Sequence, residues 1–140
     1  MANEVEALIE EARLFYQSIV QIGESLHAGS GISMGMRGVL EYLDREGDAT
    51  VPAMARARRV SRQRIQTLVN ALATRRLVRS VPNPASRRSP LIAITRSGTA
   101  LIRRMRERER RALQVGIAPR RLREAEATLR RLREALEGGR

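Results

Sequence analysis

Apolar residues recur at helical spacing in the first part of the chain and predict two helices there. From residue 3 to about residue 21 they follow steps of three and four residues, which is typical of an amphipathic helix with a broad apolar face. The glycine-rich stretch 23–31 is expected to be a loop. Ser33 is the expected N-cap of a second helix, and Gly47 is expected to end it.

Two short helices separated by a tight turn are predicted in the middle of the chain. Thr50 is the N-cap candidate of the first, with Pro52 in the first turn, where a missing N–H has no cost. This helix is expected to end near Arg58, and Ser61 to cap the next one. The arrangement has the spacing of a helix-turn-helix motif. The predicted buried stripe of the second helix is Ile65, Leu68, Val69 and Leu72.

The pattern changes from helical to strand-like after residue 76. Two short runs rich in β-branched residues, 77–81 and 91–95, flank a segment dense in proline, serine and asparagine. We therefore expect a β-hairpin with a long basic tip that carries Arg87 and Arg88. The tip belongs at a sheet edge, because its prolines cannot donate to a strand ladder.

Two further helices are predicted in the last third of the chain. The first covers residue 97 to about residue 115, and Gly116 and Pro119 interrupt the pattern after it. The second runs from residue 120 towards residue 137 with a narrow apolar seam. We expect this seam to pack against the first helix or against a second copy of the chain. Its members are Leu122, Ala125, Leu129, Leu132 and Leu136.

Length and composition narrow the classes of protein. The chain has 140 residues, which suits one domain, and an aromatic share of 2%, which leaves no stacking surface for single-stranded nucleic acid. It has no cysteine and one histidine, so we expect no disulfide, metal site or cofactor. No nucleophile–base pair or phosphate-binding glycine motif indicates an enzyme. Because there is neither an apolar run of ~18 residues nor a leader, we expect a soluble, cytoplasmic protein without membrane contact.

The charge of the chain is strongly positive and unevenly placed. The formal net charge is +12, and all 27 basic residues are arginine. Between Ala49 and Arg96 there are 11 arginines and no acidic residue. A solvated basic face does not explain the complete exclusion of Asp and Glu, whereas a surface that meets a polyphosphate backbone does. The charge pattern therefore favours nucleic acid as the partner.

Two segments resemble the MarR family. Leu-Val-Asn-Ala-Leu-Ala-Thr-Arg-Arg-Leu-Val at 68–78, preceded by Val-Ser-Arg-Gln at 60–63, is similar to the recognition helix and first wing strand of that family. Asn-Pro-Ala-Ser-Arg-Arg-Ser-Pro-Leu-Ile-Ala-Ile-Thr-Arg-Ser-Gly at 83–98 resembles its wing and the start of the next helix. Ser86 departs from the pattern, which usually has an acid there. Arg76 also departs from it, because a glycine usually supplies a left-handed turn at that position.

The element order and the resemblance imply a mainly α fold with a small β-hairpin wing. The winged helix-turn-helix is expected over about 33–96 and the dimerisation helices over about 3–22 and 97–137, in a single domain over 1–140. The resemblance implies a transcriptional regulator, a repressor that binds a palindromic operator in double-stranded DNA as a homodimer. It also implies release by a small aromatic or phenolic effector. The alternative is a non-specific architectural basic DNA-binding protein. Measuring affinity for the operator and for random duplex would distinguish the two, since specific binders hold their operator roughly 10³-fold or more tightly than random DNA.

The buried stripe leaves a polar face on the predicted recognition helix. At 100° per residue, Gln63, Thr67 and Asn70 lie opposite the stripe, with Gln66 beside them and one arginine on each flank. Gln and Asn pair bidentately with adenine, the Thr methyl touches thymine, and arginine pairs with guanine or phosphate. Ser61 is expected to cap the helix, whose first N–H groups then face a DNA phosphate. The wing arginines are expected to enter a minor groove. The candidate DNA contacts are Ser61, Arg62, Gln63, Arg64, Gln66, Thr67, Asn70, Arg87 and Arg88.

The effector side is the less determined part of the sequence. The resemblance implies a cleft between the long helices and the winged-helix lobe. Residues such as Tyr16 and Met36 more often belong to the core than to a ligand site, and His27 is expected to be exposed to solvent in its loop. The candidate effector residues are Tyr16, His27, Met36 and Arg37.

Overall fold

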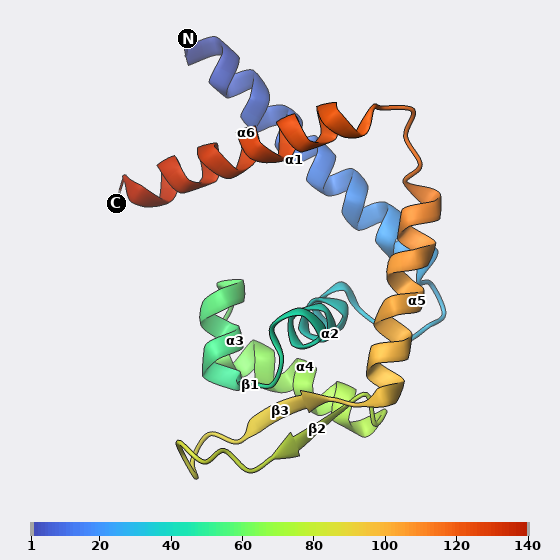
Figure 1. Cartoon of the computed structure of the whole chain (residues 1–140), viewed down its shortest axis with the longest axis vertical. Coiled ribbons are helices and arrows are strands. Elements are labelled where there is room, and N and C mark those ends of the chain that lie inside the picture. The colour runs from blue at the N-terminus through green and yellow to red at the C-terminus, as the bar shows by residue number, and fades with distance from the viewer. Residues whose placement is uncertain (1, 140) are drawn as a thin grey trace. The chain divides into compact units, whose positions relative to one another are not determined.

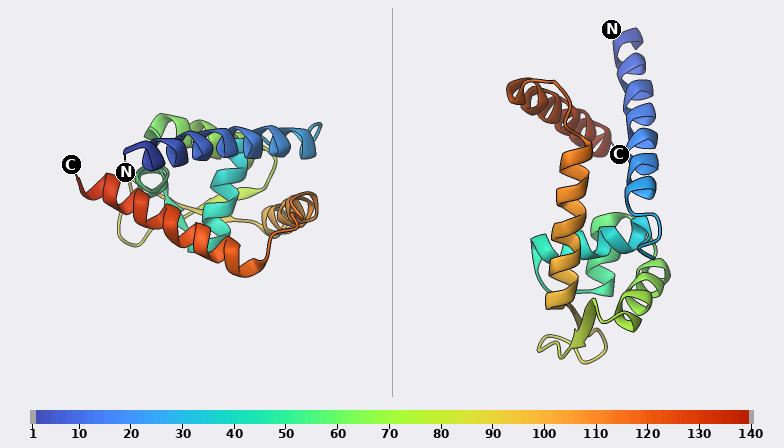
Figure 2. Two further views of the ribbon diagram at one scale, coloured as in Figure 1. Left: turned by 90° about the horizontal axis from the view of Figure 1, so that it is seen from above. Right: turned by 90° about the vertical axis from the view of Figure 1, so that its right-hand side faces the viewer.

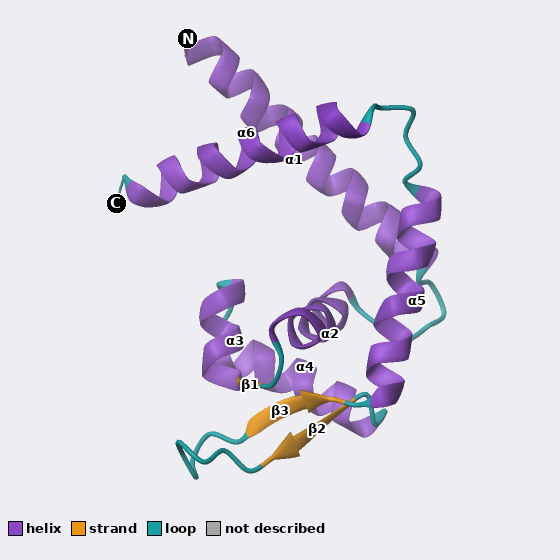
Figure 3. Ribbon diagram, viewed as in Figure 1, coloured by secondary structure: helices purple, strands orange, loops and turns teal. Residues whose placement is uncertain are grey.

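The computed structural model describes residues 2–139, which form six helices and one three-stranded sheet (Figure 1, Figure 3). The mainly helical fold class with a small β-hairpin is confirmed. The chain divides after Arg110 into two compact units, so that α6 belongs to the second unit. The elements are α1 Ala2–Leu26, α2 Met34–Glu46, β1 Ala49–Thr50, α3 Val51–Arg58, α4 Arg62–Thr74, β2 Val78–Val81, β3 Leu91–Ile94, α5 Arg96–Ala112 and α6 Pro119–Gly138.

The sheet is antiparallel with the strand order β1-β3-β2. β2 and β3 form the predicted hairpin, with Val78 opposite Ile94 and Val81 opposite Leu91. β1 was not predicted, because a strand of only two residues carries no recognisable alternation. Within residues 2–110 the hairpin projects at the end opposite to the start of α1 (Figure 1, Figure 2). This position leaves the hairpin tip free to contact a partner.

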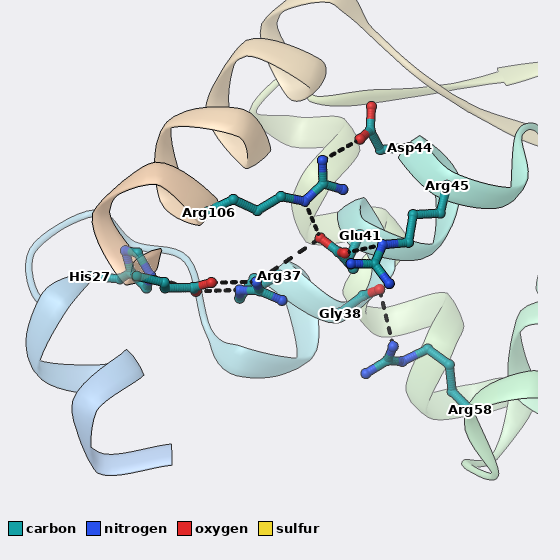
Figure 4. Close-up of polar contacts among 9 residues, drawn as sticks. His27, Arg37, Gly38, Glu41, Asp44, Arg45, Arg58 and Arg106 are labelled. Atoms are coloured by element: carbon teal, nitrogen blue, oxygen red, sulfur yellow. Dashed lines mark hydrogen bonds and ion pairs between the residues drawn. The ribbon is translucent and has the colours of Figure 1, made fainter. Parts of the chain in front are cut away.

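The core of the first unit lies between α2, α3, α4, α5 and the sheet. The predicted stripe of α4 is confirmed, since all four of its apolar residues are buried. Arg58 at the end of α3 adds a polar contact, donating from Nη1 to the main-chain oxygen of Gly38 at 3.2 Å (Figure 4). The largest fully buried side chains are Val39, Leu40, Leu43, Met54, Ile65, Leu72 and Ile102.

Three hydroxyl side chains cap the helices of the lobe as the sequence predicts. Ser33 Oγ accepts from the amide of Met36 at 3.1 Å, and Gly47 ends the same helix with a φ of 86°. Thr50 Oγ1 and Ser61 Oγ accept in the same way at the starts of α3 and α4, at 3.2 Å and 3.0 Å. Each cap satisfies an amide that the helix itself leaves without a partner.

The end of α4 keeps a left-handed turn although arginine replaces the usual glycine. Arg76 has a φ of 57°, its amide donates to the oxygen of Ala73, and the amide of Leu77 donates to the oxygen of Leu72. This is the Schellman pattern. Thr95 Oγ1 also donates to the oxygen of Arg76 at 2.8 Å. These bonds hold a conformation that costs a non-glycine residue on the order of 1 kcal/mol.

The first helix is longer than predicted, ending at Leu26 rather than near residue 22. Gly23 is helical and buried, and a Cβ built on it would lie 3.0 Å from Sδ of Met34, so the Met34 side chain packs closely on this turn of α1. The following turn begins at His27, which is only 5% exposed. The expectation that His27 is exposed to solvent is therefore wrong. Its ring is enclosed because Nε2 lies 3.0 Å from Oε1 of Glu109 in α5.

An ion-pair network joins α5 to α2 and to the turn after α1 (Figure 4). Glu109 accepts two hydrogen bonds from Arg37, from Nε and from Nη2, both at 2.5 Å. One turn away, Arg106 contacts Oε2 of Glu41 at 2.7 Å and Oδ2 of Asp44 at 2.6 Å. The Arg37–Glu109 contact is bidentate and mostly buried, so it fixes the orientation of α5 on the lobe.

Replacing Glu109 by glutamine should reduce the dependence of stability on acid pH. Burial raises the pKa of Glu109, but the hydrogen bonds from Arg37 and His27 and their charges outweigh this and hold it below its ordinary value. A depressed pKa contributes stability above the unfolded-state pKa, and this stability is lost as pH falls through the folded one. Glu109→Gln should cost about 1–2 kcal/mol at pH 7. Its free energy of unfolding should then fall less than that of the natural protein between roughly pH 5 and pH 3.

Urea unfolding at several pH values measures this effect. Glu124→Gln is the matched control, because the Glu124–Arg120 pair lies on an exposed helix surface and should change stability by less than about 0.5 kcal/mol. Parallel pH curves for the natural protein and Glu109→Gln would contradict the assignment.

Candidate nucleic-acid interface

The exposed face of α4 carries the polar residues that the sequence singles out. Ile65 and Leu72 are fully buried, whereas Gln63, Thr67 and Asn70 are exposed, as the helical period requires. Gln66 is exposed beside them. α4 is therefore anchored by its apolar stripe and presents amides and hydroxyls outwards.

Two hydrogen bonds order this face. Thr67 Oγ1 donates to the main-chain oxygen of Gln63 at 3.0 Å, so the methyl group of Thr67 is left to make outside contacts. Gln66 Nε2 donates to Oδ1 of Asn70 at 2.8 Å, one helical turn further on. These side chains thus have defined donors and acceptors before any partner arrives.

A groove of about 450 Å³ lies between α4 and the hairpin. It brings together five of the predicted contact residues and adds Arg79 and Ser80 of β2, which the sequence analysis missed. Arg79 belongs to the acid-free block, and its exposed position on a wing strand is the signal that could have identified it. The polar residues that line the groove are Arg62, Gln63, Gln66, Asn70, Arg79, Ser80, Arg88 and Ser89.

The remaining predicted contacts lie outside this groove. Ser61 caps α4, and Thr67 and Arg87 are exposed near the groove without lining it. The guanidinium of Arg64 lies against Gly35 at the start of α2 and lines a different pocket. Arg64 is thus separated from the polar face that Gln63 and Gln66 share.

The hairpin tip has an internal support that the sequence analysis did not identify. Asn83 Nδ2 donates to the oxygen of Ser89 at 2.8 Å across the tip, and Asn83 Oδ1 accepts from the amide of Ala85 at 3.1 Å. Arg87 and Arg88 lie exposed between these anchors. An asparagine turn therefore shapes the tip although Ser86 stands where an acid is usual.

The charge of the groove is positive throughout its described lining. Arg62, Arg79 and Arg88 line it, and none of its described lining residues is acidic. Guanidinium groups combined with amides suit a ligand that offers phosphates and base edges together. Double-stranded DNA has this chemistry, with α4 sized for its major groove.

Comparison with known families agrees with this geometry. Residues 31–89, which run from the loop before α2 into the hairpin tip, match the model of the MarR family. The matched segment, which includes the helix-turn-helix and most of the hairpin, is similar to the MarR family. Members of this family are DNA-binding transcription regulators.

Solved structures from the MarR family share the fold over most of the chain. A MarR family protein from Bacillus stearothermophilus is 20% identical, with a TM-score of 0.82 over 98% of each chain. A mutant MarR from E. coli, solved with operator DNA, is 16% identical, with a TM-score of 0.77 over 93% of this chain and 96% of that one. BpsR from Bordetella bronchiseptica, whose DNA binding is regulated by 6-hydroxynicotinic acid, is 22% identical. Its TM-score is 0.73, over 88% of this chain and 90% of that one.

These likenesses establish a MarR-type fold. No curated protein matches the chain.

The four candidate effector residues do not line one pocket of this MarR-family fold. Tyr16 is 67% exposed on α1, whereas Met36 is buried in the core. His27 and Arg37 meet at Glu109, where both are hydrogen-bonded. Of the four, His27 alone lines a pocket of about 590 Å³ at the junction of α1 and α2. The sequence could not distinguish these environments, because they depend on contacts with α5.

The described part of the chain contains neither a metal-binding cluster nor a membrane-spanning helix. No group of His, Asp and Glu within residues 2–139 is arranged to hold a metal ion. None of the helices described there is long and apolar enough to cross a membrane.

Proposed function

We propose that the chain is a MarR-type transcription regulator, a sequence-specific repressor that binds an inverted-repeat operator as a homodimer. The observation that carries the proposal is the groove in which the amides of α4 and the arginines of the wing face the same space. Amides read base edges in the major groove, while arginines neutralise phosphates. A protein seated on promoter DNA excludes the transcription machinery, which makes repression the direct outcome of binding.

The proposed contacts fall into three groups. Gln63, Gln66 and the methyl group of Thr67 contact base edges in the major groove. Ser61 and Arg62 contact phosphate or guanine at the start of α4, and Arg64, which is separated from the base-reading face, contacts a phosphate at its flank. Arg87 and Arg88 reach into the neighbouring minor groove, where a narrow A·T-rich segment attracts guanidinium groups.

A small aromatic or phenolic effector is proposed to act at the pocket beside His27. Arg64 lines this pocket and also belongs to α4, which supports a direct connection between the two sites. An anionic group that pairs with Arg64 would withdraw its guanidinium from DNA. Regulation of BpsR by 6-hydroxynicotinic acid is consistent with a ligand of this chemistry.

Substituting one base-reading and one wing residue tests the proposal. Gln63→Ala should weaken binding to the selected operator by about 1–3 kcal/mol and leave binding to random duplex nearly unchanged. Arg88→Ala should weaken both, and should flatten the slope of log affinity against log salt by up to about one unit, since one phosphate contact is lost. Titrations of operator and random duplex at several salt concentrations measure both effects.

Gln114→Ala, an exposed amide between α5 and α6, serves as the matched control and should change neither affinity. Equal loss on operator and random duplex for Gln63→Ala would make this residue a backbone contact. Equal affinity of the natural protein for both duplexes would favour the architectural alternative.

A further inference from the structure

Two amide side chains on the outer face of α4 are bonded to each other. Gln66 Nε2 donates to Asn70 Oδ1 at 2.8 Å, and both side chains line the groove that Arg79 and Arg88 share. Both residues are exposed, so no core contact explains the pair. The bond therefore orders two side chains on the surface that is proposed to face DNA.

The bond leaves Gln66 with the groups that adenine requires. A carboxamide has two N–H donors and one carbonyl acceptor, and Asn70 occupies one of the donors. One N–H and Oε1 remain free on Gln66. The major-groove edge of adenine presents an acceptor at N7 and a donor at N6, which match this remaining pair.

The bond also sets the orientation of the Gln66 amide. If the amide were flipped, its oxygen would face Oδ1 of Asn70, and two acceptors would be in contact without a proton between them. While Asn70 presents Oδ1, Gln66 is held in one orientation before binding, and part of the entropy of ordering a flexible side chain is lost in advance. Asn70, whose Oδ1 is engaged with Gln66, is less suited to a bidentate base contact of its own.

We propose that Asn70 is a positioning residue that orients the Gln66 carboxamide so that Gln66 reads adenine in the major groove. This inference rests on the proposed function, because it requires α4 to lie in the major groove of a specific site. It assigns the two amides different roles: Gln66 contacts the base, and Asn70 acts through Gln66.

The test measures base preference at a single operator position with the full-length protein. Selection with the natural protein and with Gln66→Ala locates the position whose preference depends on Gln66. Duplexes with adenine, guanine or 7-deazaadenine at that position are then titrated, the last lacking the N7 acceptor. The natural protein should prefer adenine over 7-deazaadenine by about 5-fold or more, because one half of a bidentate contact is removed.

Two substitutions of Asn70 separate positioning from other roles. Asn70→Ala removes the acceptor and should reduce the preference for adenine by about 2- to 10-fold, the factor expected for an ordered side chain that becomes free. Asn70→Asp keeps an acceptor for Gln66 Nε2 and should retain the preference, although its charge lowers affinity for all duplexes alike. If Asn70 served only to stabilise the fold, the Asn70→Asp variant would not be expected to restore the preference for adenine that Asn70→Ala loses.

The outcomes distinguish this inference from the proposed function. Full adenine preference in Asn70→Ala would overturn the positioning role while specific binding stands. Preference for guanine at the Gln66 position, loss of preference in Asn70→Asp, or a selected site unchanged by Gln66→Ala would also overturn it. Failure of the natural protein to distinguish operator from random duplex would overturn the proposed function as well.

Discussion

Leu129→Glu should convert the protein from a dimer into a monomer. α6 has no buried residue, and its seam leaves Leu122 46%, Leu129 41% and Leu136 65% exposed. An isolated helix with such a seam gains about 1.5–3 kcal/mol for each leucine that a partner helix fully buries. A second copy of the chain is the proposed partner, so a carboxylate in the seam should be desolvated at the interface and prevent association.

The loss of the dimer should also weaken operator binding by about 100-fold or more, because a monomer reaches only one half-site and loses the avidity of two. Light scattering at micromolar concentration measures the mass, and titration measures the affinity. Ala127→Glu is the control, since Ala127 lies on the opposite side of α6 and is exposed. It adds the same charge and should remain dimeric. A natural protein that is monomeric at micromolar concentration would refute this account of α6.

Gly98→Ala should destabilise the winged-helix lobe by about 2 kcal/mol or more. Gly98 is buried in the first turn of α5, and a Cβ built on it would lie 2.2 Å from the main-chain oxygen of Leu77 and 2.7 Å from Cγ1 of Ile94. The backbone oxygen cannot rotate away as a side chain can. Either α5 or the start of the wing must therefore move, and overpacking of this kind typically costs about 1–3 kcal/mol, occasionally more.

The same movement should disturb the two hydrogen bonds by which the Thr95 side chain links the end of α4 to the start of α5. Thr95 Oγ1 donates to the oxygen of Arg76 and accepts from the amide of Gly98 at 3.1 Å. Chemical unfolding measures the loss of stability. Gly138→Ala adds the same methyl group where no atom lies within 4 Å, and should leave stability unchanged or slightly higher. Unchanged stability of Gly98→Ala would contradict the close approach.

Local signals in the sequence were sufficient to predict the helices and the hairpin of the winged-helix part that carries the candidate interface. A hydroxyl residue followed by an apolar stripe determines where a helix starts and which side it buries, so Ser61 and the polar face of α4 were predicted correctly. The hairpin followed from its β-branched runs and proline-rich tip. These features depend on residues that are close together in the chain.

Features that depend on distant residues were missed or mistaken. His27 is buried and contacts Glu109 of α5, and the Met34 side chain packs against Gly23, through which α1 continues. The Gln66–Asn70 bond joins residues one turn apart, yet propensity alone does not show which polar pairs form. Arg79 enters the groove only once the hairpin folds beside α4.

Selection of bound duplexes from a random pool by the full-length protein tests the central claim most directly. A homodimer that reads bases through α4 should enrich an inverted repeat whose half-sites are about one helical turn, ~10 bp, apart. The enriched duplex should bind at least roughly 10³-fold more tightly than the starting pool. A pool without an enriched sequence, bound with an affinity that depends on salt alone, would contradict sequence-specific recognition.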